Sequence, residues 1–181
     1  RIVGAILDYS KLEAGRLSIE SVPFDLESTV IDVVDMLAPR AAEKEIPLIF
    51  RYAPDAPRNL LGDPGRIRQV LMNLLGNAIK FTHAGNIIIF VQQLGFAQSR
   101  AVMRITVLDT GIGIPKDKYP AIFEQFEQAN ANTYREYGGT GLGLAITNQL
   151  VRLMGGQVGL NSREGNGSRV RVTLAMQLAG D

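Results

Sequence analysis

The chain has 181 residues and contains no Cys, no Trp, one His and 19 Gly, with a formal net charge of +1. Without Cys it can form no disulfide framework, thiolate nucleophile or cysteine-ligated metal site, and one His cannot build a multi-histidine site. Any metal would therefore have oxygen ligands, which favours magnesium. The near-neutral charge excludes a global basic field for nucleic acid, and the longest apolar runs fall short of the ~18 residues of a membrane span.

The first segment predicts an amphipathic helix over residues 1–14 that ends at Gly15. Its apolar stripe comprises Ile2, Ala5, Ile6, Tyr9 and Leu12. A helix this short does not fold alone, so the stripe packs either on a partner helix or on the core of this domain, and both interpretations stay open. Because the chain starts with Arg inside this pattern, we expect a fragment cut from something larger.

A strand, a helix and a second strand are expected next. Residues 17–24 alternate in the manner of a strand, and residues 46–52 have the composition of another. Between them, residues 26–41 carry an apolar helical face that Pro39 is expected to kink or divide.

The most regular helix is predicted between Asp63 and about Thr82. Asp63 is a favourable N-cap, and Pro64 is a favourable first helical residue. The buried face of this helix comprises Ile67, Val70, Leu71, Leu74, Leu75, Ala78 and Ile79, at the spacing of an amphipathic helix.

The second half of the chain predicts strands over 87–93 and 102–109, a helix over 141–154, and a hairpin of strands over 157–162 and 169–177. We expect a connection around residues 95–99 between the first two strands. Residues 110–140 show no sustained period, which is typical of a lid or binding loop. The order of elements predicts an α+β fold in which helices cover one face of a mixed or mostly antiparallel sheet.

Three polar residues of the regular helix share one face. Asn73, Asn77 and Lys80 lie within an arc of about 60° at the helical spacing. Asn is a mediocre helix former, so two of them one turn apart favour a function: an amide oxygen offered to Mg²⁺ and an ammonium offered to phosphate. The alternative is an ordinary solvated face, with Lys80 favoured by the helix dipole.

Asp109 follows a predicted strand and precedes a Thr-Gly-Ile-Gly-Ile-Pro turn. A carboxylate beside two glycines can be approached closely by a flat ligand. Because an ionised carboxylate only accepts hydrogen bonds, it would favour the exocyclic amine of adenine and repel the O6 of guanine. The alternative is a turn residue that makes a local Asx bond.

A glycine-rich run over residues 138–144 opens the predicted helix over 141–154. Free N–H groups and the positive end of the helix dipole make such a start an anion site. The run is neither a dinucleotide-binding fingerprint nor a P-loop, and the protein-kinase signatures are absent from the sequence.

Four segments in this order resemble the sequence boxes of sensor histidine kinases. Residues 63–82 resemble the N box, 109–115 the first glycine box, 122–126 the F box and 139–144 the second glycine box. Residues 7–16 are similar to the end of the second helix of the dimerisation domain, in the style common among hybrid kinases.

The resemblance implies a two-layer α/β sandwich of the Bergerat type, with a mixed sheet covered on one face by helices and a short N-terminal helix. It implies that the domain holds Mg²⁺ and ATP between its helices and a lid over residues 127–138. Asn77 would bind Mg²⁺, Asn73 and Lys80 would serve the phosphates, and Asp109 would accept the adenine amine.

The remaining implied site residues come from the two glycine boxes and the lid. Those that shape the base pocket are Gly111, Gly113 and Ile114, and those that wrap the phosphates are Gly139, Thr140, Gly141, Leu142, Gly143 and Leu144. Arg135 matches a basic lid position that can reach the γ-phosphate, and with Lys80 it would be catalytic. The alternative for Arg135 is a solvated loop arginine.

The resemblance also implies a reaction and its partners. Such kinases transfer the γ-phosphate to a His of a separate helical hairpin, so residues 1–16 would be the end of a dimerisation and phosphoacceptor helix and residues 17–181 the catalytic domain. His83 follows the N-box helix in a turn and is not expected to be the acceptor. The partners would be those helices, a response-regulator receiver domain and a second copy in a homodimer, without nucleic acid. The location would be cytoplasmic, with a parent chain that can be membrane-anchored.

Two other functions stay open. An ATP-hydrolysing relative, in the class of the gyrase and heat-shock chaperone ATPases, would have a Glu base four residues before the metal Asn, where this sequence has Asn73. An amide has no basic character, so hydrolysis is expected to be slow. The other alternative is a non-catalytic nucleotide-binding module with a regulatory role.

Overall fold

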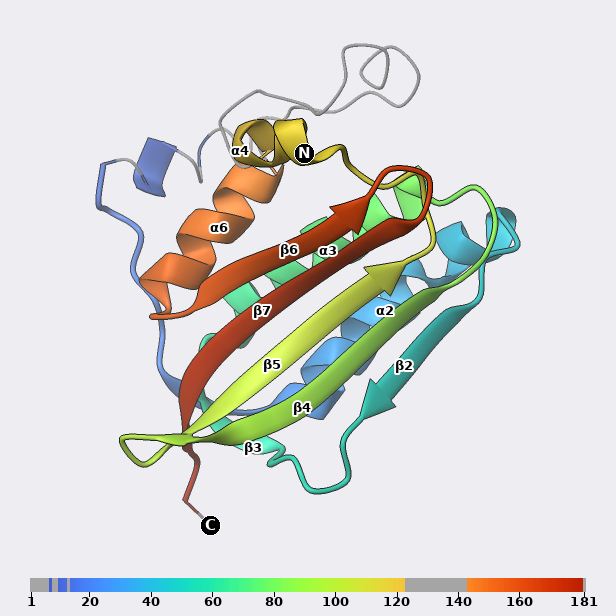
Figure 1. Cartoon of the computed structure of the whole chain (residues 1–181). Coiled ribbons are helices and arrows are strands. Elements are labelled where there is room, and N and C mark those ends of the chain that lie inside the picture. Colours follow the sequence, from blue (N-terminus) through green and yellow to red (C-terminus); the bar gives the residue numbers. More distant parts are fainter. Residues whose placement is uncertain (1–6, 8–9, 13, 123–142, 181) are drawn as a thin grey trace.

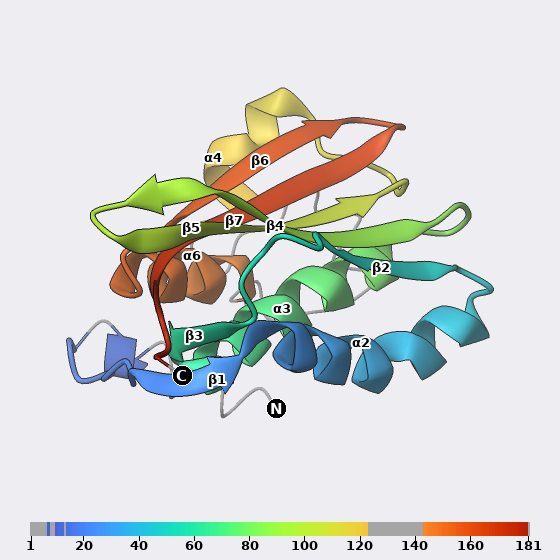
Figure 2. The ribbon, with the colours of Figure 1, turned by 90° about the horizontal axis from the view of Figure 1, so that it is seen from below.

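The computed structural model describes residues 7, 10–12, 14–122 and 143–180. Its elements form two layers, a sheet and a set of helices on one face of it (Figure 2). The predicted α+β sandwich is therefore confirmed. Much of the helix predicted over 1–14 lies outside the described residues, although residues 7 and 10–12 are helical. No helix of the described segments is both long and apolar enough to cross a membrane.

The sheet has seven strands in the order β1-β3-β7-β5-β4-β2, with β6 paired to β7. The strands are β1 (Val22–Asp25), β2 (Leu48–Tyr52), β3 (Asn59–Gly62), β4 (Ile87–Ala97), β5 (Arg100–Asp109), β6 (Gln157–Arg163) and β7 (Gly167–Leu178). Only the β2–β4 pair is parallel among the described pairings. In Figure 1 the long strands β4, β5 and β7 lie side by side with the helices behind them.

The helix layer consists mainly of α2 (Leu26–Glu43), α3 (Pro64–Phe81) and α6 (Gly143–Leu153). Helix α3 packs against both α2 and α6. It begins and ends as predicted, with the side chain of Asp63 accepting from the N–H of Arg66 at 2.9 Å. All seven residues of its predicted apolar face are buried, and each large aliphatic side chain contributes about 1.5–3 kcal/mol by leaving water. This burial fixes α3, and with it the polar residues on its other face.

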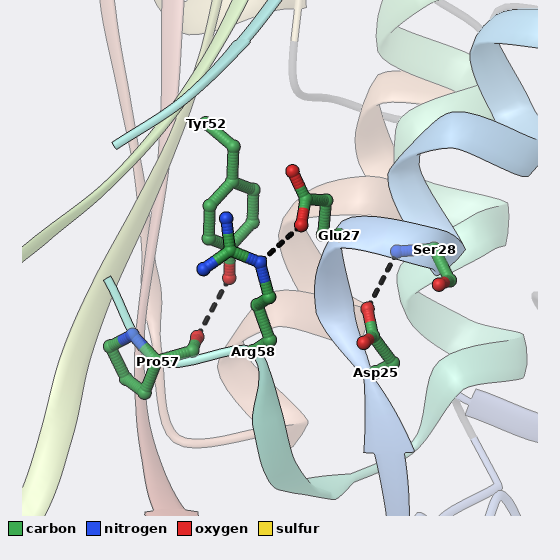
Figure 3. Close-up of polar contacts among 6 residues, drawn as sticks. All are labelled: Asp25, Glu27, Ser28, Tyr52, Pro57 and Arg58. Atoms are coloured by element: carbon green, nitrogen blue, oxygen red, sulfur yellow. Dashed lines mark hydrogen bonds and ion pairs between the residues drawn. The ribbon is translucent and has the colours of Figure 1, made fainter. Parts of the chain in front are cut away.

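The start of α2 is held by a group of polar contacts, here named the α2-start cluster and formed by Asp25, Glu27, Ser28, Tyr52, Pro57 and Arg58 (Figure 3). A carboxylate oxygen of Asp25 accepts from the Ser28 N–H at 2.7 Å and caps the helix. The Arg58 guanidinium pairs with Glu27 and lies 5.0 Å from the ring centroid of Tyr52.

The Tyr52 hydroxyl, on β2, donates to the Pro57 carbonyl at 2.7 Å. Burial of the ring raises the pKa of Tyr52 to about 12, against the weaker opposing effect of the Arg58 charge. The polar groups of the α2-start cluster thus satisfy one another.

Several element boundaries differ from the sequence prediction. The first strand is shorter, because residues 17–21 do not join the ladder, and the N–H of Glu20 donates to the Asp63 carboxylate at 3.0 Å instead. Helix α2 runs through Pro39 without division. Pro39 lies near the end of α2, and the carbonyl that loses its partner belongs to Asp35, which is exposed and can bond water.

The β4–β5 hairpin is tighter than expected. Gly95 does not end the first strand but marks a register shift within it. The chain reverses at Gln98 and Ser99, whose φ angles of 49° and 64° are those of a two-residue hairpin turn. The strands consequently extend to Ala97 and from Arg100.

Candidate functional site

The polar face of α3 lies beside α6. Asn73, Asn77 and Lys80 are all half-buried on this helix. The Asn73 amide donates to the hydroxyl of Thr147, a fully buried residue of α6, at 3.3 Å. The two helices therefore hold this face in a fixed orientation, and the plain solvated face of the alternative interpretation does not describe Asn73.

Asn77 is suited to bind a cation. The structure records no hydrogen bond of its amide with any described residue. Its oxygen is a neutral ligand of the kind that Mg²⁺ binds. No three His, Cys, Asp or Glu side chains of the described segments gather as a metal site. The donor set therefore fits an ion that takes most of its ligands from phosphate and water, as Mg²⁺ does.

Lys80 lies in the last turn of α3, with its ammonium 5.2 Å from the ring centroid of Phe81. Burial lowers the pKa of Lys80, and the nearby charge of Arg40 lowers it further. An anionic ligand beside this ammonium would favour its charged form and so oppose both of these effects on the pKa.

Asp109 is the last residue of β5, on the side of the strand that faces the helices. Its inward neighbours Met103, Ile105 and Val107 are buried in the core. One carboxylate oxygen, Oδ1, accepts from the Gly111 N–H at 2.9 Å and the Ser168 N–H at 3.3 Å. Burial raises the pKa of Asp109, and these two bonds oppose the rise. Neither bond uses Oδ2, which can accept from a ligand.

The turn after β5 contacts the end of α3 directly. The N–H of Ile112 donates to the carbonyl of Phe81 at 3.1 Å. On its other side, the N–H of Ile114 donates to the Ser162 hydroxyl at 2.8 Å, and the Gly165 N–H donates to the Ile112 carbonyl at 2.7 Å. The turn is therefore fixed between the end of α3 and the β6–β7 hairpin.

The glycines of this turn are required by packing. A Cβ on Gly111 would lie 2.4 Å from the Phe81 carbonyl oxygen, and one on Gly113, whose φ is +68°, would lie 2.0 Å from the Arg163 carbonyl oxygen. No side chain fits at either distance, so these positions allow the turn to approach its neighbours. The sequence indicated access for a ligand and did not indicate this contact.

Tyr119 and Ser162 are two site residues that sequence reasoning missed. Tyr119 begins α4 (Tyr119–Ile122), and its hydroxyl donates to the Ser162 carbonyl and accepts from the Ser162 N–H at 2.6 Å. The Ser162 hydroxyl also lies 2.7 Å from that of Ser168. Serines on the two sides of the predicted hairpin turn were the available signal, whereas Tyr119 lies in the segment without period.

The structure brings two groups of predicted residues together and leaves a third group outside its described part. Asn73, Asn77 and Lys80 on α3 adjoin the turn that carries Asp109, Gly111, Gly113 and Ile114, through the bond between Ile112 and Phe81. Gly143 is the first residue of α6, and Leu144 packs half-buried against the core. Arg135, Gly139, Thr140, Gly141 and Leu142 lie outside the described residues. His83 is exposed in the bend between α3 and β4.

Comparison with known proteins gives one family match. The family described as histidine kinase-, DNA gyrase B-, and HSP90-like ATPase matches residues 62–178. The signal transduction histidine-protein kinase BarA of Escherichia coli K12 is 45% identical over 167 residues, which is 92% of this chain and 18% of that protein. The sensor protein GacS of Pseudomonas syringae is 42% identical over 178 residues, 98% of this chain and 20% of that protein. The chain thus spans about a fifth of these relatives.

Solved structures have the same fold. Full-length ShkA in complex with AMPPNP matches with a TM-score of 0.85 and 32% identity, over 99% of this chain and 36% of that chain. The catalytic domain of the histidine kinase ThkA matches with a TM-score of 0.73 and 26% identity, over 87% of this chain and 99% of that chain.

Proposed function

The chain belongs to the family of histidine kinase-, DNA gyrase B- and HSP90-like ATPases, as an ATP-binding catalytic domain of the sensor histidine kinase type. We propose that it binds Mg-ATP and transfers the γ-phosphoryl group to a histidine. The acceptor would be a His of a dimerisation domain, outside residues 17–181. The observation that carries the proposal is the hydrogen bond between Ile112 and Phe81, because it joins a helix suited to phosphate to a turn suited to adenine.

Asp109 would select the base. Its Oδ1 is engaged by two backbone N–H groups, which leaves Oδ2 to accept the exocyclic amine of adenine. An ionised carboxylate has no proton to offer the O6 of guanine. Gly111, Gly113 and Ile114 would form the wall of the base pocket, with their backbone fixed by the β6–β7 hairpin.

The polar face of α3 would serve the phosphates. Asn73 and Lys80 would contact phosphate oxygens, and Asn77 would hold Mg²⁺ through its amide oxygen. A bound magnesium ion supplies neutralisation of the charge that the phosphate oxygens carry during transfer. The protein's part is mainly positioning, since phosphoryl transfer requires the reacting oxygens in line.

The second glycine box and the lid would complete the site. Residues 139–144 would wrap the phosphates, where Gly143 starts α6 and its helix N-terminus favours anions. Arg135 of the lid would reach the γ-phosphate and, with Lys80, would be catalytic.

Slow hydrolysis distinguishes this proposal from an ATPase of the gyrase and chaperone class. The position of their Glu base is occupied by Asn73, whose amide donates to Thr147 and cannot take a proton from water. Transfer to a presented His side chain is therefore favoured over transfer to water.

The parent protein is proposed to be a hybrid kinase that acts as a homodimer, because the relatives include hybrid signal transduction histidine kinases. Residues 1–16 would then be the end of its dimerisation and phosphoacceptor helix, and a receiver domain would take the phosphoryl group from the histidine.

Two measurements test the proposal. Calorimetry with Mg-ATP on residues 1–181 should show binding that Asp109→Asn and Asn77→Ala remove; no binding by the unsubstituted chain would refute the kinase function. A longer chain that includes both dimerisation helices should then acquire an acid-labile phosphate on His from labelled ATP. Binding without that label would favour the regulatory module, and rapid release of inorganic phosphate would favour the ATPase.

A further inference from the structure

Lys44 connects α2 to the last turn of α3. It is the C-cap residue of α2, and its ammonium donates to the backbone carbonyls of Ile79 and Lys80, the latter at 3.2 Å. Carbonyls in the final turn of a helix have no partner within the helix. A side chain from another helix therefore satisfies two of them here.

The backbone around Lys44 is itself fixed. The next residue, Glu45, has a φ of +56°, and the Ile46 N–H donates to the Ala41 carbonyl at 3.0 Å, which closes the end of α2. The side chain of Ile46 is only 3% exposed. Lys44 thus reaches α3 from a rigid base, and its ammonium can determine where the last turn of α3 lies.

That last turn carries two elements of the proposed site. It bears Lys80, and the carbonyl of Phe81 in the same turn accepts from the N–H of Ile112, in the turn after β5 that is proposed to bind the base. A lysine in a final turn commonly bonds the terminal carbonyls of its own helix. Because Lys44 donates to two of these carbonyls, it competes for them with the ammonium of Lys80.

We propose that Lys44 is a positioning residue for phosphate binding, which fixes the last turn of α3 so that Lys80 is directed to the phosphates of ATP. The proposal rests on the proposed function of Lys80 and names a residue outside the sequence boxes. Lys44 acts here through Lys80 and does not contact the nucleotide.

Calorimetry with Mg-ATP on the chain of residues 1–181 tests it, with three variants. Lys44→Met keeps the length of the side chain and removes the charge, and we expect roughly tenfold weaker binding, the scale of a lost charge-assisted hydrogen bond. Lys44→Arg keeps a donor and should bind within about threefold of the unsubstituted chain. Arg51→Gln removes an exposed cation of β2 whose side chain makes no recorded bond to a described residue, and should change binding less than about twofold.

A double-mutant cycle with Lys80→Ala separates positioning from general loosening. If Lys44 acts through Lys80, Lys44→Met has little further effect in the Lys80→Ala background. A full additional tenfold loss there would overturn the proposal. Adenosine, which has no phosphates, gives a second measure: Lys44→Met should lower its affinity much less than that of ATP, and an equal loss for adenosine and ATP would show a structural role only.

The outcomes distinguish the two proposals. If the unsubstituted chain does not bind Mg-ATP, the proposed function fails. If it binds and Lys44→Met binds equally well, or if Arg51→Gln weakens binding as much as Lys44→Met, the function stands and the role of Lys44 fails.

Discussion

The α2-start cluster and the candidate site are both polar regions at the edge of the same core, and their charges are arranged differently. In the cluster, Arg58 pairs with Glu27 and stacks on Tyr52 (Figure 3). Opposite charges are thus paired with each other, and hydrogen-bond donors meet acceptors. At the site, Asp109 is desolvated, and its recorded donors among the described residues are backbone N–H groups. The charge of Arg40 lowers the pKa of Lys80.

This difference separates structural polar groups from groups suited to a ligand. A cluster that satisfies its own charges gains nothing from an added anion. Burial raises the pKa of Asp109 and so disfavours its ionised form in the folded chain, and a ligand that donates hydrogen bonds to the carboxylate offsets this cost. Substitutions in the two regions should therefore affect stability and binding in different proportions.

The largest effect is expected where the site depends on close backbone contact. Gly113→Ala places a methyl group 2.0 Å from the Arg163 carbonyl oxygen at a φ of +68°, and should lower the free energy of unfolding by about 3 kcal/mol or more. Gly165→Ala is the matched control, since its φ is +80° and nothing lies within 4 Å of the added carbon. It should cost about 1 kcal/mol. Equal losses in urea denaturation would contradict the packing role of Gly113.

Asp109→Asn should separate binding from stability. We expect Mg-ATP affinity to fall on the order of 100-fold, because the amide cannot replace a charged acceptor for the adenine amine. Burial raises the pKa of Asp109, so the folded state keeps the proton to higher pH and the ionised carboxylate lowers stability above that pKa. At pH 7 the variant should unfold at the same or a higher temperature in calorimetry. A lower unfolding temperature would show that Asp109 is structural.

Asp25→Ala should have the opposite profile. Loss of the bond to the Ser28 N–H removes the cap of α2 and should cost about 1 kcal/mol of unfolding free energy. Mg-ATP affinity should stay within a factor of two, because the start of α2 contributes no group to the site. A parallel fall in affinity would show that the two regions are coupled.

The smallest effect concerns how the free energy of unfolding changes at alkaline pH. The pKa of Tyr52 in the folded chain is raised by burial to about 12, from the ordinary value of 10.0 for tyrosine. The phenol therefore ionises more readily in the unfolded state, and the free energy of unfolding should fall as pH rises from 10 toward 12. Tyr52→Phe should remove this part of the pH dependence and leave nucleotide binding unchanged. A variant with the unaltered alkaline slope would exclude Tyr52 as its source.

Features with local causes were predictable from the sequence. Asp63 and Pro64 specify the start of α3, and an apolar period fixes its buried face, so the relative placement of Asn73, Asn77 and Lys80 follows from one helix. The identity of Asp109 as a strand end followed from alternation and the glycines after it.

Features that depend on distant residues were not predictable. The hydroxyl of Tyr119 meets the backbone of Ser162 across 43 positions. The first strand begins only at Val22, and before it the Glu20 N–H donates to Asp63, also 43 positions away. No local pattern encodes such a partner. The same reason applies to Gly113, whose requirement for glycine comes from a carbonyl on another strand.

The bond between Asp109 and the Ser168 N–H also has a consequence for folding order. It spans 59 positions along the chain and exists only when β5 and β7 have paired in register. Pairing over such separations is slow, because the loop entropy is spent before the contact forms. The carboxylate thus acquires its final geometry only when this pairing has formed, and the unfolded chain offers no site for the base. A nucleotide is therefore a ligand of the completed chain alone, and its concentration enters the folding equilibrium by mass action.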